Sequence, residues 1–324
     1  MAVRDIIVIG ASAGGFDAIK KVVAGFPADL PAAVFVTIHV SGKSDGVLPQ
    51  VITRAGVLEA IHPTDGQPIE QGRIYVAPPD HHLLLHSGHI HLGHGPRENL
   101  QRPCINAMFR SAAHAYSDRV AGVLLTGLLD DGVAGLWEIQ QRNGAAIVQD
   151  PSEAVFPSMP ERAIRGLKVP YIVRLSEMAQ LLLKLATSEQ GQPFDSGPER
   201  PILKPAAQTC PECSGALSSI RMGQLREYRC HVGHRFGLET LIEQKSKNIE
   251  RVLEVALAQS EELSSLLRVA LEDSDTEEAG ALRNGLRRRE EEQRILRLLS
   301  GNEKDYVQDE ETEAESSNSH HVTR

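Results

Sequence analysis

A serine near the start of the chain lies in a glycine-rich turn, in the sequence Gly10-Ala11-Ser12-Ala13-Gly14. The spacing Gly-x-Ser-x-Gly is typical of a nucleophile held on a sharp turn between a strand and a helix. Two other interpretations are open, namely a dinucleotide-binding loop and a tight turn without chemistry. A dinucleotide loop needs a second glycine where Ser12 stands, and an acidic residue after the next strand, which here ends in His39. The turn therefore indicates a nucleophile more than a nucleotide site.

Two further residues could activate that serine. His39 ends the second predicted strand, and Asp131 follows the longest apolar run of the chain, at 120–125. Because a serine hydroxyl is a weak nucleophile at neutral pH, it needs a base such as histidine within hydrogen-bond distance. A carboxylate beyond the histidine fixes its tautomer and stabilises the imidazolium. Ser12, His39 and Asp131 are therefore predicted to form a catalytic triad.

Each of these assignments has an alternative in the same stretch of sequence. His39 could be a histidine that merely ends a strand, and Asp131 could cap the helix predicted from residue 133. Asp130 competes with Asp131 for either role. The backbone N–H groups of Ala13 and Leu128 are the predicted donors to an oxyanion.

The elements that would carry these residues alternate between strand and helix. Short apolar runs without polar alternation predict buried parallel strands, and they lie at 6–9, 34–39, 73–77, 120–125, 145–149 and from 171. Helical periodicity between them predicts an α/β fold with a doubly wound, mostly parallel sheet. Ligands of such a sheet bind beyond the carboxyl ends of its strands, where all three residues lie.

One stretch interrupts that alternation. Residues 82–92 alternate apolar and polar side chains about Ser87-Gly88, which predicts an antiparallel hairpin. The hairpin carries several histidines, which are His86, His89, His91 and His94. A metal site is one interpretation of them, and a solvated face of the hairpin is the favoured one.

The composition narrows the class of protein. The 324-residue chain has a net charge of −9, which argues against nucleic acid or an anionic membrane as a partner. No stretch reaches the ~18 apolar residues of a membrane helix, so neither membrane insertion nor a signal peptide is expected. Cys104 stands alone, and the other three cysteines cluster at metal-ligand spacing rather than as a disulfide set, which with these absences predicts a cytoplasmic protein.

The composition also divides the chain. We expect a catalytic domain over residues 1–188, a linker over 189–209 that is rich in Gly, Pro, Ser and Gln, and a small module over 210–237. Residues 238–300 show apolar side chains at helical spacing and an interruption near 273–280, which predicts two amphipathic helices. The tail over 301–324 has seven acidic residues against two basic ones and is predicted to be disordered.

The small module has the spacing of a metal site. Cys210 and Cys213 form Cys-x₂-Cys, and after sixteen intervening residues Cys230 and His234 form Cys-x₃-His. Four such ligands predict one structural Zn²⁺ in a zinc-ribbon-like module, with His231 as the competing fourth ligand. No cofactor is expected for catalysis.

The first 186 residues also resemble a known family, the catalytic domain of the chemotaxis-type (CheB-type) protein-glutamate methylesterases. The matching segments lie in one collinear register over about residues 3–186, and they are Ile7-Val8-Ile9-Gly10-Ala11-Ser12-Ala13-Gly14-Gly15, Val36-Thr37-Ile38-His39, Tyr75-Val76-Ala77-Pro78-Pro79, Arg102-Pro103, Leu124-Leu125-Thr126-Gly127, Asp131-Gly132-Val133-Ala134-Gly135 and Gln149-Asp150. The resemblance implies that Ser12, His39 and Asp131 are the catalytic triad. It also implies hydrolysis of glutamyl methyl esters on chemoreceptor-like proteins, with glutamine deamidation as a second activity.

The chain departs from the family pattern at several positions near these motifs. Ala13 replaces the usual threonine, and Leu128-Leu129 replace the usual Met-Gly. Around Arg102-Pro103, three residues replace the usual His, Ser and Asp, and they are Gln101, Cys104 and Asn106. None removes the triad, but they bear on substrate preference.

The region after the catalytic domain resembles an extension of some stand-alone methylesterase-like proteins. The resemblance implies a form without an N-terminal receiver domain, and the C-terminal helices are expected to bind a regulatory protein or a second copy of the chain. The alternative function is a non-catalytic signalling adaptor that retains the fold. The presence of all three triad residues favours the enzyme.

Overall fold

The structure is a computed structural model that describes residues 3–39, 47–188, 202–272 and 278–300. The predicted tail at 301–324 and the part of the predicted linker at 189–201 lie outside the described residues. The chain divides into two units, residues 1–242 and residues 243–324, and the predicted catalytic residues and metal ligands all belong to the first.

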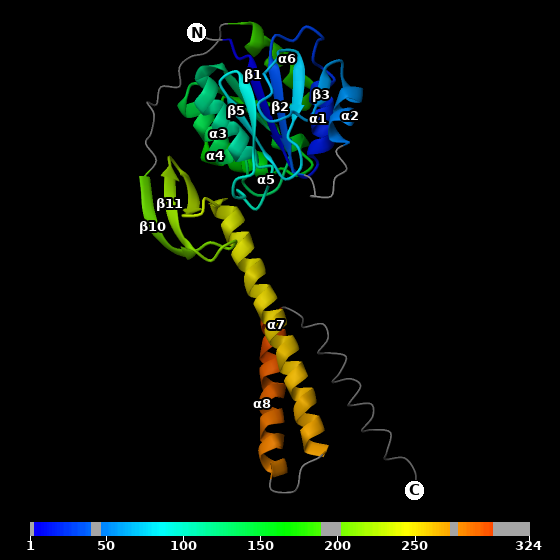
Figure 1. Cartoon of the computed structure of the whole chain (residues 1–324), viewed down its shortest axis with the longest axis vertical. Helices are drawn as coiled ribbons and strands as arrows, with labels where there is room; N and C mark the ends of the chain where they lie inside the picture. Colours follow the sequence, from blue (N-terminus) through cyan, green and yellow to red (C-terminus); the bar gives the residue numbers. More distant parts are fainter. Residues whose placement is uncertain (1–2, 40–46, 189–201, 273–277, 301–324) are drawn as a thin grey trace. The chain divides into compact units, whose positions relative to one another are not determined.

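A seven-stranded sheet forms the centre of the first unit (Figure 1). Its order is β3-β4-β2-β1-β7-β8-β9, and every pair is parallel. The strands are β1 (Ile6–Ala11), β2 (Ala33–Ile38), β3 (Glu59–Ile61), β4 (Arg73–Val76), β7 (Val120–Leu124), β8 (Ala145–Gln149) and β9 (Tyr171–Val173). The strand order reverses between β1 and β7, so the sheet is doubly wound, as predicted. Ligand sites of such sheets lie at this reversal, beyond the carboxyl ends of the strands.

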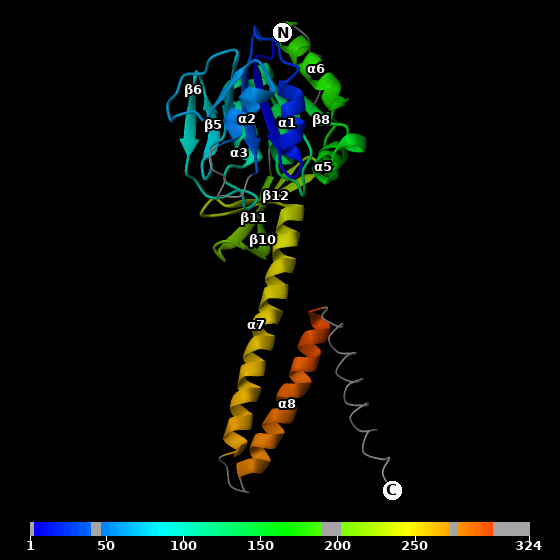
Figure 2. The same ribbon diagram turned by 90° about the vertical axis from the view of Figure 1, so that its right-hand side faces the viewer.

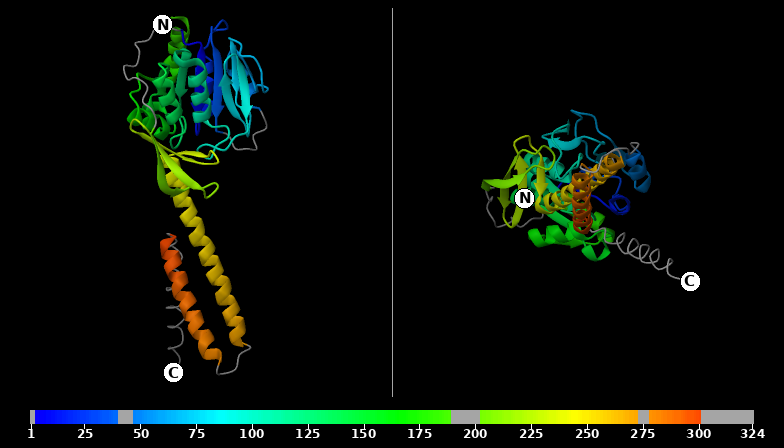
Figure 3. Two further views of the ribbon diagram at one scale, coloured as in Figure 1. Left: turned by 60° about the vertical axis from the view of Figure 1, so that its left-hand side comes forward. Right: turned by 90° about the horizontal axis from the view of Figure 1, so that it is seen from below.

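Helices cover both faces of the sheet (Figures 1 and 3). On one face, side chains such as Ile7 and Ile9 of β1 pack against three helices, α1 (Gly15–Val23), α2 (Leu48–Ala55) and α6 (Leu175–Thr187). On the other face, Ile6 and Val8 contribute to a core with α3 (Ile105–Tyr116), α4 (Val133–Gln141) and α5 (Ser158–Gly166). Because alternate residues of β1 serve opposite cores, its apolar run has no polar position.

The predicted hairpin is present as a separate two-stranded antiparallel sheet that packs on the second core. Its strands are β5 (His82–His86) and β6 (His89–Gly93). Strand β3 was not among the predicted strands, since three residues are too few to show a periodicity. Two short 3₁₀ turns, Ser117–Arg119 and Pro151–Glu153, complete this part of the chain.

The small module is a four-stranded antiparallel sheet, in the order β10-β11-β12-β13. Its strands are β10 (Ile202–Thr209), β11 (Ala216–Met222), β12 (Leu225–Cys230) and β13 (Arg235–Gly237). Residues 202–209 had been expected to belong to a linker, and the structure places them in the sheet. Strand β10 lies at the edge, where a proline such as Pro205 is tolerated because its missing N–H need not pair with a neighbouring strand.

The second unit contains two helices that run side by side (Figure 2). Helix α7 (Leu238–Glu272) begins in the first unit, and α8 (Glu278–Leu299) follows it. The Gln293 amide donates to the Ser264 hydroxyl at 2.8 Å, and Arg297 pairs with Glu261 at 2.9 Å. Val252 and Leu266, from the predicted apolar stripe, are 59% and 66% exposed. No helix in the described part of the chain has the length and apolar character that crossing a membrane requires.

Candidate active site and metal site

Ser12 lies directly after β1, in the turn that leads into α1. The turn is held by two backbone hydrogen bonds, from the Ser12 N–H to the Thr126 carbonyl at 3.0 Å and from the Gly15 N–H to the Ser12 carbonyl at 2.8 Å. Gly14 has a φ of 71°, a left-handed conformation that favours glycine. The sharp turn places the Ser12 hydroxyl at the carboxyl end of the sheet, as the Gly-x-Ser-x-Gly spacing predicts.

His39 follows β2 and connects the serine to a carboxylate. Its Nδ1 lies 3.1 Å from the Ser12 Oγ, and its Nε2 lies 2.7 Å from the Asp131 Oδ2. Because a carboxylate can only accept, the Nε2–H donates to Asp131 and leaves Nδ1 with a free lone pair. Nδ1 is therefore the nitrogen that can accept the Ser12 proton. The structure brings together the three side chains that the sequence predicts as a triad.

Asp131 is buried and its two oxygens accept six hydrogen bonds. Oδ2 accepts from His39 and from the Ile105 N–H at 2.8 Å. Oδ1 accepts from four donors, and they are the Asn99 amide, the Cys104 thiol and the N–H groups of Asn106 and Gly132. The Ile105 and Asn106 N–H groups belong to the first turn of α3, where a helix has unpaired donors and a favourable dipole for an anion.

These contacts keep Asp131 ionised despite its burial. Burial by itself raises the pKa of a carboxyl group. Here the hydrogen bond and the charge of His39 act against burial, as do the hydrogen bonds from the Cys104 thiol and the Ile105 N–H, and the pKa of Asp131 falls to about 2. An anion at this position stabilises the imidazolium that forms when His39 accepts a proton.

Two of the departures from the family pattern lie at this carboxylate. Burial is the main cause that raises the pKa of the Cys104 thiol well above its usual value, and the charge of Asp131 adds to it. The thiol therefore stays neutral and donates to the Asp131 Oδ1 at 3.1 Å. The Asn106 side chain accepts from the Gly135 N–H at 2.7 Å and so ties α3 to α4. The sequence marks both positions as departures from the family pattern but predicts no role for them. Their position close to Arg102-Pro103 was the one sequence feature that pointed to the site.

The predicted oxyanion donors belong to the residue after Ser12 and to the loop at 127–131. The Gly127 N–H donates to the Phe156 carbonyl, and a Cβ built on Gly127 would lie 2.9 Å from the Ser12 Cβ, so the start of the 127–131 loop adjoins the serine. Among the described residues, the backbone N–H groups of Ala13 and Leu128 make no hydrogen bond. They are therefore free to bind a negatively charged oxygen.

Asp130 points away from His39, whereas the next residue, Asp131, contacts that histidine. The Asp130 Oδ1 accepts from the Thr240 hydroxyl at 2.6 Å, and its Oδ2 accepts from the Glu239 N–H at 3.2 Å. Asp130 therefore binds the first turn of α7, where the helix has unpaired N–H groups. Burial, together with the adjacent Glu239 carboxylate, raises the pKa of Asp130 to about 7.

We expect Asp130→Asn to change the pH dependence of stability while catalysis stays near that of the wild type. The pKa of Asp130 in the folded chain exceeds the ordinary value of 3.8, so its proton stabilises the fold fully below pH 4. That stabilisation is lost as pH rises through 4 to 7. An amide cannot ionise, so the variant should be more stable than the wild type at pH 8 by a few kcal/mol, on the order expected from the shift.

Urea unfolding of both proteins at pH 4.5 and pH 8, with kcat on a small ester, measures these effects. Equal pH dependence of the two unfolding curves would mean that Asp130 ionises normally. A loss of kcat comparable to that of Asp131→Asn would mean that the wrong carboxylate had been assigned to His39.

The four predicted metal ligands lie together in the small module. Their ligand atoms all lie within 4.8 Å of one another, and His234, rather than His231, is the histidine among them. The Cys213 and Cys230 sulfurs are 3.8 Å apart, and the His234 Nδ1 lies 3.7 Å from the Cys210 sulfur and 3.5 Å from the Cys230 sulfur. Tetrahedral Zn²⁺ with its usual bond lengths requires about 3.8 Å between sulfurs and about 3.6 Å between sulfur and nitrogen. The residues present therefore fit zinc.

The hairpin histidines do not form a comparable group. In the described ranges, the cluster in the small module is the one place where three or more such ligands meet. His91 instead pairs with Asp65 at 2.8 Å on the surface, and the His86 ring stacks on His89. This agrees with the interpretation of the hairpin as a solvated face.

Comparisons with known proteins give consistent results. The model of the CheB methylesterase family matches residues 7–182. A Leptospira interrogans protein with protein-glutamate methylesterase/protein-glutamine glutaminase in its name is 34% identical over 182 residues, which cover 56% of this chain and 94% of that protein. A Chromohalobacter salexigens protein named protein-glutamate methylesterase/protein-glutamine glutaminase is 37% identical over 188 residues, which cover 56% of this chain and 52% of that protein.

A solved structure is also similar. The catalytic domain of the Thermotoga maritima CheB methylesterase matches with a TM-score of 0.55 and 26% identity. The match covers 57% of this chain and all of that domain. The family model, at residues 7–182, lies within the first unit.

Proposed function

Because this chain belongs to the CheB methylesterase family and is a carboxylic-ester hydrolase, we propose that it is a serine esterase that removes methyl groups from glutamate side chains of chemoreceptor-like proteins. The observation that carries the proposal is the chain of hydrogen bonds from Ser12 through His39 to the buried Asp131. An adaptor without activity, the alternative function, does not require this arrangement.

The geometry supports a two-step hydrolysis. The Ser12 Oγ attacks the ester carbonyl carbon while the His39 Nδ1 accepts the hydroxyl proton, and Asp131 stabilises the resulting imidazolium. The N–H groups of Ala13 and Leu128 hold the negative oxygen of the tetrahedral intermediate. As the intermediate collapses, His39 returns the proton to the leaving oxygen and methanol departs. Water then attacks the acyl-enzyme with His39 again as base, and glutamate and free Ser12 result.

The same steps account for a second activity. With a glutamine side chain as substrate, the leaving group is ammonia and the acyl-enzyme is identical. We therefore propose glutamine deamidation as well, in agreement with the names of the relatives.

The surface around Ser12 fits a protein substrate. Apolar side chains near the turn are unusually exposed, including Leu128 at 50% and Val155 at 70%. A Cβ built on Gly14 would meet Val155 and Phe156, so these two side chains border the serine turn. An apolar border of this kind favours contact with side chains of a receptor helix over a free small ester.

The small module and the helices add further proposals. We propose one structural Zn²⁺ bound by the cysteines and His234, since four protein ligands leave no position for water. Free thiol ligands favour a reducing compartment, which supports the cytoplasm. The exposed apolar side chains of α7 and α8 support binding of a regulatory protein or a second copy.

Release of methanol from a methylated receptor fragment tests the function. The wild-type chain should release methanol in proportion to the glutamates that it demethylates, and Ser12→Ala should release none above the uncatalysed rate. A glutamine-containing fragment, with ammonia as the measured product, tests deamidation separately. If the chain hydrolyses a small activated ester but releases no methanol from the receptor fragment, it is a serine esterase and the proposed protein substrate is wrong.

A further inference from the structure

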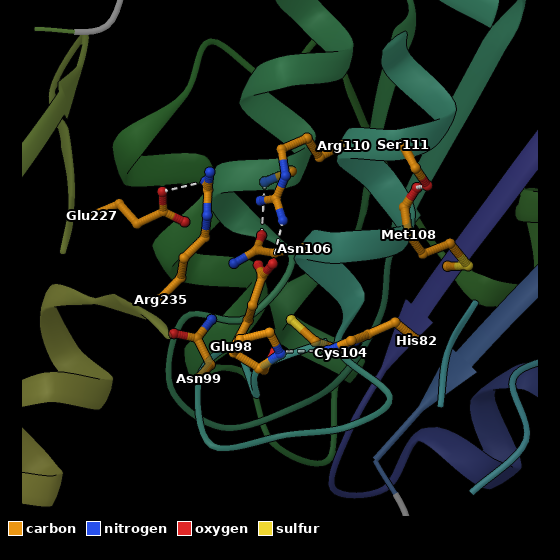
Figure 4. A network of polar contacts seen from close by, with 12 residues as sticks. His82, Glu98, Asn99, Cys104, Asn106, Met108, Arg110, Ser111, Glu227 and Arg235 are labelled. Atoms are coloured by element: carbon orange, nitrogen blue, oxygen red, sulfur yellow. Dashed lines mark hydrogen bonds and ion pairs between the residues drawn. The ribbon is translucent and has the colours of Figure 1, made fainter. Parts of the chain in front are cut away.

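Asn99 is a buried residue in the loop between β6 and α3, and it lies outside every predicted site. It is 5% exposed and has a φ of 49°, a left-handed conformation that asparagine tolerates better than most residues. In Figure 4 its side chain lies beside Glu98, on the side of the network where Arg235 lies.

The Asn99 amide joins the catalytic carboxylate to that module. Its Nδ2 donates to the Asp131 Oδ1 at 3.0 Å, and its Oδ1 accepts from the Gly237 N–H at 2.8 Å. An amide has donors at one end and an acceptor at the other. Because the Gly237 N–H can only donate, the oxygen of Asn99 must face the module and its NH₂ group must face Asp131.

The same loop is fixed to the module by its backbone. The Asn99 N–H donates to the Arg235 carbonyl at 2.7 Å, and Glu98 forms a parallel bridge with Arg235. Residues 98–99 therefore extend the pairing of β13 (Arg235–Gly237), and they fix the position from which the Asn99 side chain reaches Asp131.

Buried charged pairs accompany this backbone contact. Glu98 pairs with Arg110 in the catalytic domain, and Glu227 pairs with Arg235 at 2.9 Å in the module (Figure 4). Glu98 and Glu227 are 9% and 2% exposed, so separation of the module would expose both pairs to rearrangement. Each pair lies on one side of the contact, so the two parts are joined here by the backbone pairing of residues 98–99 with β13 and by the Asn99 side chain.

We propose that Asn99 is a positioning residue for the catalytic aspartate, and that the module sets the orientation of its amide through Gly237. The inference rests on the proposed function. The Asn99 donor holds one oxygen of Asp131, so that the other oxygen stays aligned with the His39 Nε2. The full catalytic rate then requires the module to be folded against the catalytic domain, although the module supplies no atom to the substrate.

Two substitutions at Asn99 separate positioning from a structural role. Asn99→Asp retains the shape, the left-handed backbone and the acceptor for Gly237, and at a pH high enough to ionise it, its carboxylate cannot donate to Asp131. Asn99→Gly suits the positive φ and removes both contacts. Since a hydrogen bond to a charged group contributes about 1.5–3 kcal/mol, each variant should lower kcat on a small ester by about 10- to 100-fold with little change in KM. The downfield proton resonance of the His39 Nε2–H should shift in both.

Gly237→Ala tests the contribution of the module. A Cβ at this position would lie 2.0 Å from the Asp130 Oδ2, and we expect the Gly237 segment to shift and its hydrogen bond to Asn99 to lengthen. We expect a fall in kcat, and no further fall when Gly237→Ala is added to Asn99→Gly, because the module acts through Asn99. Gly95→Ala is the matched control. Gly95 lies in the loop that carries Asn99, and no atom lies within 4 Å of its added Cβ.

The outcomes distinguish this inference from the proposed function. Wild-type kcat in folded Asn99→Asp, or additive losses in the double variant, would overturn the positioning role while Ser12→Ala still abolished activity. Full activity of Ser12→Ala would instead reject the proposed function itself. If Asn99→Gly does not fold, Asn99→Asp and the His39 resonance decide the matter alone.

Discussion

Ser12→Ala is expected to lower kcat/KM for a small activated ester by about 10⁴- to 10⁶-fold, the range found when a triad nucleophile is removed. The loss is this large because no other described hydroxyl lies within hydrogen-bond distance of the His39 Nδ1. Some rate above the uncatalysed reaction should remain, since the Ala13 and Leu128 N–H groups still stabilise the oxyanion. Initial rates with 4-nitrophenyl acetate, corrected for spontaneous hydrolysis, measure the effect.

Substitutions at His39 and Asp131 should also lower activity strongly, and the effects at Ser12 and His39 should not add. His39→Ala should cost about as much as Ser12→Ala, and the double variant should cost no more than either, because the pair acts as a unit. Asp131→Asn should lower kcat by about 10⁴-fold, since an amide NH₂ facing Nε2 would favour the wrong tautomer of His39. Asp130→Asn is the matched control for that variant. Additive losses for Ser12 and His39, or activity of Ser12→Ala close to wild type, would reject the triad.

Removal of the metal is the second change with a large expected effect. Structural zinc sites contribute about 10–16 kcal/mol to folding in small zinc modules. The core of this module is small, with Tyr228 and Phe236 among its few buried apolar residues. We therefore expect protein purified without chelator to contain about one zinc per chain. Chelation should unfold residues 202–237, as measured by amide hydrogen exchange.

Matched histidine variants identify the fourth ligand. His234→Ala should lose zinc and protection from exchange in the module, whereas His231→Ala should keep both, because His231 lies outside the ligand cluster. Loss of the metal should lower kcat by no more than Asn99→Gly does, since the module acts on catalysis only by orienting Asn99. Loss of all esterase activity in step with zinc, while the catalytic domain stays folded, would contradict a structural role. Retention of zinc by His234→Ala would contradict the ligand assignment.

Several features of this protein follow from local sequence. The apolar runs of β1, β2 and β7 predict strands buried on both faces, because only a central parallel strand leaves no position for polar side chains. Strand and helix alternation then places Ser12, His39 and the Asp130-Asp131 pair at one edge of the sheet. The cysteine spacing predicts a metal site for a similarly local reason, since two residues of a tight turn can reach one ion.

The choice between neighbouring residues required the tertiary structure. Asp130 and Asp131 are equivalent in pattern, yet one binds α7 and the other binds His39. Leu129 and Gly132 on either side have positive φ values of 63° and 87°, so the loop turns the two carboxylates in different directions. No periodicity encodes such a loop, because its conformation depends on the helices and strands that it joins.

Contacts between segments distant in sequence were likewise decided by the tertiary structure. Asn99 and Gly237 are 138 positions apart, and no local pattern marks either as a partner of Asp131. The pairing of β10 at 202–209, in a stretch with the composition of a linker, depends on the edge that β11 offers to it. Sequence periodicity records which faces of an element are buried, and thus it determined the fold and the edge at which catalysis is proposed. The direction of each hydrogen bond in the site depends on donors that only folding brings within 3 Å, and so it was decided by the tertiary structure.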